Sequence, residues 1–223
     1  MDNNYYIGID PGLSGGFAAV VDNRILYKMA MPTISFKTPE DKTKTEIDRE
    51  GVLSILKLCP VHTHVVIEKQ EAFRGQDIVS SCTICKNYGI LLTALTVAHT
   101  YITEEPPKVW QAHFGIVSVK ESGGQSTKEQ AFHVAQRLYP DASFMKSERS
   151  RVVHDGIVDA TLIAAYCQFR FAPFEEQKTG MQVIGPKVAP LDVKPIAGVK
   201  ELSTPLKAPR RFLKRKKENA EKR

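Results

Sequence analysis

Apolar runs in the first 105 positions predict the strands of a sheet. Residues 5–10 (YYIGID) form a short apolar run typical of a buried strand. The runs at 15–22 and 24–31 are separated by Asn23, which indicates two antiparallel neighbours. Further runs at 64–68 (HVVIE) and near 98–103 predict two more strands. The polar segment 32–45 contains two prolines and several Lys and Thr residues, so we expect a loop there.

Helical spacing of apolar residues appears between and after these runs. It predicts helices at 46–58, at 78–95 after a capping Asp77, and at 155–171. Pro106 and Pro107 favour a short helix through Trp110, a residue that we expect in the core. Ser126 and Glu129 match a capping box that begins a helix ending near 138. The glycine-containing segment 115–125 is expected to be a loop.

The order of these elements favours an α/β fold with a mixed five-stranded sheet and helices on both faces. Residues 1–172 are expected to form the folded domain. From Pro173 the pattern dissolves, because six of the 13 prolines lie there and no amphipathic period survives. We interpret 173–206 as an extended linker and 207–223 as a basic tail.

The charge distribution separates the tail from the rest. Residues 207–223 hold nine Lys or Arg and two acids, a net charge of +7. The other 206 residues hold 22 basic and 23 acidic residues, a net charge of −1, so the folded domain is nearly neutral. A basic segment of this kind is typical of nucleic-acid binding and is also compatible with nuclear targeting.

Composition indicates an intracellular protein. The longest apolar stretches are broken by Lys, Asp or Asn, so we expect no membrane contact, and MDNNYYIGID lacks a signal-like core, so we expect no secretion. Cys82 and Cys85 form a lone C-x-x-C within a helical run, without a second pair for zinc. We therefore interpret the four cysteines as ordinary buried thiols in the cytoplasm or nucleoid of a bacterium or phage-infected cell.

Four acids stand at positions suited to chemistry. Asp10 and Glu68 each end an apolar strand, and functional sites in such sheets lie at the carboxyl ends of strands. Asp155 and Asp159 are four residues apart, which places both on one face of a helix. His154 directly precedes this pair and could join it.

Carboxylates from separate segments repel one another unless a cation lies between them. Oxygen-rich acidic sites suit Mg²⁺ or Mn²⁺. Two such ions about 4 Å apart can activate water and stabilise a leaving oxygen in phosphodiester hydrolysis. Taken singly, Asp10 could serve only a turn, Glu68 only a solvated strand end, and Asp155 and Asp159 only the helix dipole. Their joint placement favours a metal site.

Three motifs resemble the RuvC-like Holliday-junction resolvases, especially phage and chloroplast-type members. IGIDPGLSGG, VVIEKQ and HDGIVDATLIAAY occur in that family's order and spacing, and PPKVWQAHFG and STKEQAFHVAQRLYP resemble its connecting segments. The resemblance covers roughly residues 5–170. It implies a ribonuclease H-like fold, a homodimer, and an endonuclease that resolves four-way DNA junctions with two Mg²⁺ or Mn²⁺ per site.

The family's acids fall on Asp10, Glu68 and Asp159, with either Asp155 or His154 as the fourth ligand. Cellular RuvC proteins usually space the last pair three apart, whereas Asp155 and Asp159 are four apart. This departure leaves both candidates open, and we favour Asp155.

DNA contacts are expected from four residues of the folded domain and from the basic tail. The segment after the Glu enters the junction in the family, and here it carries Phe73 and Arg74. Phe73 could stack on a base or could simply pack under the next helix. Lys120 and Lys128 lie where the family contacts the DNA backbone. The tail adds Arg210, Arg211, Lys214, Arg215, Lys216 and Lys217.

Two other functions compete with a nuclease. Sugar kinases and actin-like ATPases also begin with a strand, an Asp and a Gly-rich turn, but they need a second such domain, for which this chain is too short. A junction-binding protein with vestigial acids is the other alternative. The presence of all four acids argues against it.

Overall fold

A five-stranded mixed sheet forms the centre of the molecule. The structure, a computed structural model, describes residues 5–60, 62–71 and 75–173. The strands lie in the order β3-β2-β1-β6-β7. β2 runs antiparallel to β1 and β3, whereas β1, β6 and β7 run parallel to one another. This arrangement confirms the predicted α/β class and the mixed five-stranded sheet.

Five strands precede α1, strands and helices then alternate as far as α3, and α4 and α5 follow without a further strand. The strands are β1 (Tyr6–Asp10), β2 (Gly16–Val21), β3 (Arg24–Ala30), β4 (Thr33–Lys37), β5 (Thr43–Ile47), β6 (His64–Glu68) and β7 (Tyr101–Glu105). The helices are α1 (Arg49–Leu56), α2 (Ile78–Val97), α3 (Pro107–His113), α4 (Thr127–Leu138) and α5 (Asp155–Phe171).

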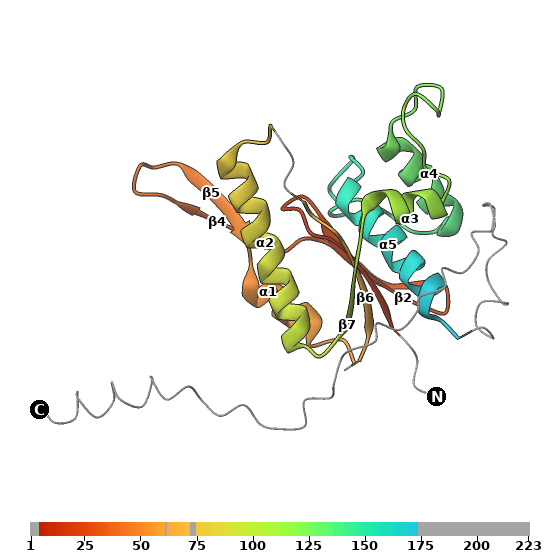
Figure 1. The fold of residues 1–223 in the computed structure, drawn as a ribbon, viewed down its shortest axis with the longest axis horizontal. Coiled ribbons are helices and arrows are strands. Elements are labelled where there is room, and N and C mark those ends of the chain that lie inside the picture. The colour runs from red at the N-terminus through yellow and green to blue at the C-terminus, as the bar shows by residue number, and fades with distance from the viewer. Residues whose placement is uncertain (1–4, 61, 72–74, 174–223) are drawn as a thin grey trace, which may run out of the picture. The chain divides into compact units, whose positions relative to one another are not determined.

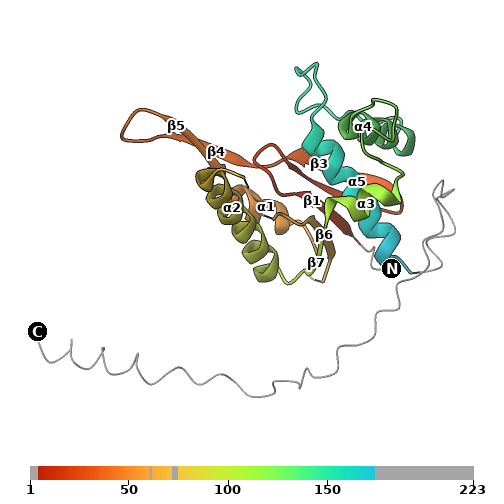
Figure 2. The same ribbon diagram turned by 45° about the horizontal axis from the view of Figure 1, so that its top comes forward.

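Helices cover both faces of the sheet, as the sequence predicts (Figures 1 and 2). α1 and α2 pack on one face, against alternate side chains such as Ile7, Ile9 and Ile67. α3, α4 and α5 lie on the other face, where Tyr6 and Val66 point. The period of two along each strand therefore decides which side chains reach which helices.

The backbones of α5 and β1 lie in direct contact. A Cβ added to Gly8 would overlap the backbone of Ala160 and Ala164, so the strand has no room for a side chain there. At the start of the helix, a Cβ on Gly156 would overlap the backbone of Ser14 and Gly15. Two glycines thus set how closely α5 lies on the sheet and on the turn after β1.

The prediction for residues 32–45 was wrong. They contribute most of an antiparallel hairpin, β4–β5, in which Thr33 pairs with Ile47 and Lys37 with Thr43. Its strands, TISFK and TKTEI, carry the Thr, Ile and Phe residues that favour extended backbone. The hairpin projects from the sheet (Figure 1) and is largely exposed. Its polar composition is therefore due to contact with solvent and does not indicate a loop. α1 therefore begins at Arg49, after the cap Asp48, later than predicted.

Helix caps were predicted more accurately. The Asp77 side chain accepts from the Ser80 amide at 2.9 Å and begins α2. The capping box of Ser126 and Glu129 begins α4, and α5 has the predicted bounds. α3 extends three residues beyond Trp110, and β7 begins a little later than predicted. Trp110 is 1% exposed, which confirms its place in the core.

α2 exposes an unusually apolar surface. Ile78, Val79 and Val97 are 79%, 72% and 64% exposed. By length and composition alone this helix could cross a membrane, a test that core helices of soluble proteins also pass. The cysteine interpretation was partly wrong, since Cys82 and Cys85 are exposed on this helix while Cys167 is buried. Helical periodicity alone did not show that one side of α2 lacks a neighbour within the described residues.

Gly8→Ala should destabilise the protein by roughly 3 kcal/mol, because its methyl group has to displace the backbone of α5. Gly89→Ala is the matched control, since Gly89 lies in α2 with no atom within 4 Å of an added Cβ. Replacing a glycine within a helix by alanine should raise the free energy of unfolding by about 0.5–1 kcal/mol. Urea unfolding measures both values. Equal effects of the two substitutions would contradict the close contact.

Candidate active site

Asp10 and Glu68 leave adjacent parallel strands at the same level. Ile9 pairs with Ile67 in the register of β1 and β6, so the next residue of each strand is the acid. Ile9 and Ile67 face α1 and α2. Because side chains alternate, both carboxylates project toward α5 from strands about 4.8 Å apart.

The turn after β1 holds the Asp10 carboxylate in place. The Gly12 amide donates to Asp10 Oδ1 at 3.3 Å, and the Gly15 amide donates to the Gly12 carbonyl at 2.9 Å. A Cβ on Gly15 would overlap the Asp10 carbonyl, so the turn is filled by its own backbone. The Gly-rich motif therefore positions an acid and leaves no open cradle at Gly15.

The start of α5 supplies the second pair of acids. His154 is the N-cap, and its Nδ1 accepts from the Ile157 amide at 3.3 Å. Asp155 is the first helical residue, and Asp159 lies one turn later with Ala160 buried beside it. The cap occupies Nδ1 of His154 and leaves its Nε2 uninvolved, so the choice between His154 and Asp155 as the partner of Asp159 stays a prediction.

Burial and mutual repulsion raise the pKa values of three of these carboxyls. Burial, together with the charges of Asp10, Glu68 and Asp155, raises the pKa of Asp159 to about 8. Burial and the charge of Asp10 raise the pKa of Glu68 to about 7. Burial also raises the pKa of Asp10, against the opposing Gly12 amide and the Lys128 charge. The negative charges of the acids therefore raise one another's pKa values, and among the described residues the charge of Lys128 compensates them only in part.

Lys128, at the start of α4, is the cation that approaches this group. Its Nζ lies 2.5 Å from Asp155 Oδ2, and this bond raises the pKa of the lysine. Both side chains are partly exposed, so the pair itself contributes little stability. Lys128 occupies one oxygen of Asp155, whose charge still acts on Asp10 and Asp159.

The carboxylates have the right chemistry for a hard divalent cation. Within the residues that the structure describes, no three His, Cys, Asp or Glu side chains converge closely enough to form a coordination shell. The raised pKa values of Asp10, Glu68 and Asp159 show that a cation among them would relieve repulsion. Oxygen donors of this kind suit Mg²⁺ or Mn²⁺.

Sequence reasoning missed two residues that contact Glu68. The Trp110 indole Nε1 donates to Glu68 Oε2 at 3.0 Å, and Gln70 Nε2 donates to Oε1 at 3.3 Å. The sequence placed Trp110 in the core and gave it no polar role. The available signal was the indole N–H itself, which usually finds a hydrogen-bond acceptor when it is buried.

Of the other residues predicted to contact DNA, the structure describes only Lys120. Lys120 is exposed in the segment between α3 and α4, and it forms no ion pair with any residue in the described ranges. Phe73 and Arg74 lie outside the described residues, as do Arg210, Arg211, Lys214, Arg215, Lys216 and Lys217. Their expected roles stay predictions.

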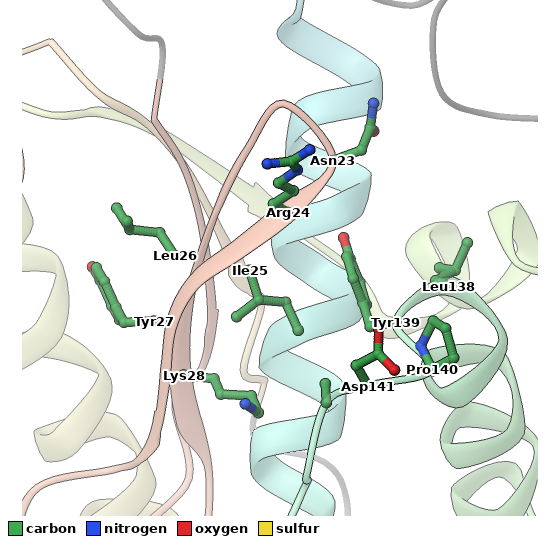
Figure 3. A pocket seen from close by; sticks show the side chains of 11 residues that line it. Asn23, Arg24, Ile25, Leu26, Tyr27, Lys28, Leu138, Tyr139, Pro140 and Asp141 are labelled. Atoms are coloured by element: carbon green, nitrogen blue, oxygen red, sulfur yellow. The ribbon is translucent and has the colours of Figure 1, made fainter.

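A separate hollow of about 700 Å³ lies between β3 and the residues after α4 (Figure 3). Arg24, Ile25 and Lys28 line one side, and Tyr139 and Asp141 line the other. None of the four acids is among its lining residues, so this hollow is distinct from the acidic group.

Comparison with known proteins finds similar solved structures, among them two of Thermus thermophilus RuvC. Thermus thermophilus RuvC in complex with a Holliday junction substrate has a TM-score of 0.43 and 14% identity, covering 76% of this chain and 96% of that one. A second T. thermophilus RuvC structure has a TM-score of 0.42 and 17% identity, covering 74% and 95%. No family model and no curated protein matches. The functional argument therefore rests on this chain's own residues.

Asp159→Asn should stabilise the metal-free protein at alkaline pH. The pKa of Asp159 is raised in the folded state, so the folded state binds the extra proton and stability falls as pH rises from about 4 to about 8. The amide removes that loss and should stabilise the folded state by several kcal/mol at pH 8.5, since one unit of pKa shift corresponds to about 1.4 kcal/mol. Its advantage should disappear as the pH falls toward 4. Thermal unfolding in EDTA across this range measures the difference, and an equal effect at both ends would contradict the repulsion.

Proposed function

We propose that this protein is a metal-dependent endonuclease that resolves four-way DNA junctions. The observation that carries the proposal is the shared placement of three acids: Asp10 and Glu68 end adjacent parallel strands in register, and Asp159 lies near the start of the helix that they face. Burial and neighbouring acids raise the pKa values of all three. The acids come from two strand ends and one helix start. Bringing their charges together lowers the free energy of unfolding, as their raised pKa values indicate. Such an arrangement favours a polyvalent cation and a phosphodiester substrate.

In this proposal Asp10, Glu68, Asp155 and Asp159 hold two Mg²⁺, or Mn²⁺ in substitution. When bound, such ions supply the positive charge that phosphodiester hydrolysis needs and help to activate water. Asp155 would exchange its bond to Lys128 for the metal. The freed ammonium group then lies at the edge of the site, where it can contact a DNA phosphate.

The turn after β1 argues against the kinase alternative. A phosphate-binding turn needs free amides and space beside its glycines. Here the amides of Gly12 and Gly15 donate to the turn itself, and Gly16 packs against Gly156 and Met29. These contacts support a turn that positions Asp10.

Asp10→Asn, Glu68→Gln and Asp159→Asn should each reduce cleavage of a labelled four-way junction by at least about 100-fold, because each removes a metal ligand. Junction binding should persist, since no positive charge is lost. Asp141→Asn is the control, an exposed acid in the turn after α4 that lines the separate hollow. Asp155→Asn should be more severe than His154→Ala. Cleavage is measured with Mg²⁺ and with EDTA. Full activity of Asp10→Asn would exclude the metal site, and binding without any cleavage by the wild type would favour a non-catalytic junction protein.

We further propose that the active form is a homodimer joined through α2. A four-way junction is nearly two-fold symmetric, so a two-fold dimer presents two sites to matching phosphates. α2 exposes Ile78, Val79 and Val97, and Gly89 is also exposed on this helix. This apolar face supports a protein contact. The basic residues of the tail and the segment with Phe73 and Arg74 are proposed to contact DNA.

Gly89→Glu should convert the dimer to a monomer and abolish paired cleavage, because it places a charge at the centre of the proposed interface. Gln136→Glu, on the exposed side of α4, is the matched control and should leave the dimer intact. Light scattering after size exclusion gives the mass. A wild-type monomer that still makes paired nicks would contradict the proposal, and recovery of the full chain with floated liposomes would assign the apolar face to a membrane.

A further inference from the structure

Trp110, the chain's single tryptophan, reaches Glu68 from the core. It lies in α3, which begins two residues after β7 ends. The side chain is 1% exposed and packs in the cluster that also holds Ile157 and Leu162 of α5. Its indole N–H donates to Glu68 Oε2 at 3.0 Å.

Both oxygens of the Glu68 carboxylate receive a donor. Gln70 Nε2 reaches Oε1 at 3.3 Å, while Trp110 reaches Oε2. Each carboxylate oxygen has about two acceptor positions, so one position on each stays open for another ligand. The two donors therefore fix the plane of the carboxylate without saturating it.

These donors differ from the partner of Asp155 in charge. Lys128 brings a positive charge to Asp155 and so competes with a metal ion there. The indole and amide groups are neutral, so they orient Glu68 and leave its negative charge uncompensated. Orientation by a buried neutral donor is typical of the groups that surround metal ligands.

We infer that Trp110 is a positioning residue that holds Glu68 in the orientation needed to bind a divalent cation. The inference rests on the proposed function, since it assigns Glu68 to the metal. Because the indole packs against α5, it also links the orientation of Glu68 to the helix that carries Asp159. One buried side chain thus ties together acids from two distant segments.

The indole should report on the metal directly. Titration of the metal-free protein with Mg²⁺ alone should give a saturable change in tryptophan emission, because Trp110 is the only tryptophan and its N–H bonds to a metal ligand. In Glu68→Gln the change should be lost. A change of the same size in Glu68→Gln would overturn the link between indole and metal.

Trp110→Phe keeps most of the packing and removes the N–H. It should weaken Mn²⁺ binding about tenfold, measured from the free Mn²⁺ signal in electron paramagnetic resonance, and raise the Mg²⁺ needed for half-maximal cleavage to match. Junction affinity in EDTA should not change. Val134→Ala, in the same buried cluster, should lower the melting temperature without changing Mn²⁺ affinity.

The outcomes separate the inference from the proposed function. If the wild type binds Mn²⁺ but cuts no junction, the proposed function fails while the comparison of Mn²⁺ affinities still tests Trp110. If Trp110→Phe binds Mn²⁺ as tightly as the wild type, the positioning role is overturned whether or not junctions are cut. If the wild type binds no Mn²⁺, both are overturned.

Discussion

The backbone contact between β1 and α5 at Gly8 is the constraint on which the rest of the structure depends. A helix carrying acids can approach a strand end carrying another acid only if little else lies between them. Gly8 and Gly156 remove the side chains that would hold the helix away. The same approach buries Asp159 and raises its pKa, so the tight packing and the electrostatic tension of the site have one cause.

The acidic group is an unfavourable arrangement that the surrounding structure sustains. Isolated buried carboxyls respond to desolvation by taking up protons, as the raised pKa values of Glu68 and Asp159 indicate. Fixed neutral donors, the Gly12 amide at Asp10 and the Trp110 indole at Glu68, oppose that response locally. Lys128 does so from the rim, where solvent screens it. Among the described residues, the positive charge that acts on the acids is thus peripheral.

The sequence carried much of this arrangement, but unevenly. The placement of Asp10 and Glu68 at strand ends, and of Asp159 one turn into α5, was predictable from the apolar runs around them, and the bounds of α5 followed from its Ala-rich apolar run. The β4–β5 hairpin was not, because its exposed strands lack the apolar alternation that burial imposes. The hydrogen bond from Trp110 to Glu68 joins residues 42 positions apart, and no local pattern encodes it. The exposure of Cys82 and Cys85 depends on what lies beside α2, which is equally non-local.

The register of β1 and β6 has an evolutionary consequence. Asp10 and Glu68 face α5 only because an even alternation precedes each of them, and the loss or gain of one residue would turn either acid to the opposite face. Insertions and deletions within these strands are therefore tolerated only in pairs. The tip of the β4–β5 hairpin, residues 38–42, bears no such parity and packs in neither main core. Among descendants of this chain, length should vary at that tip and stay constant in the strands that carry the acids.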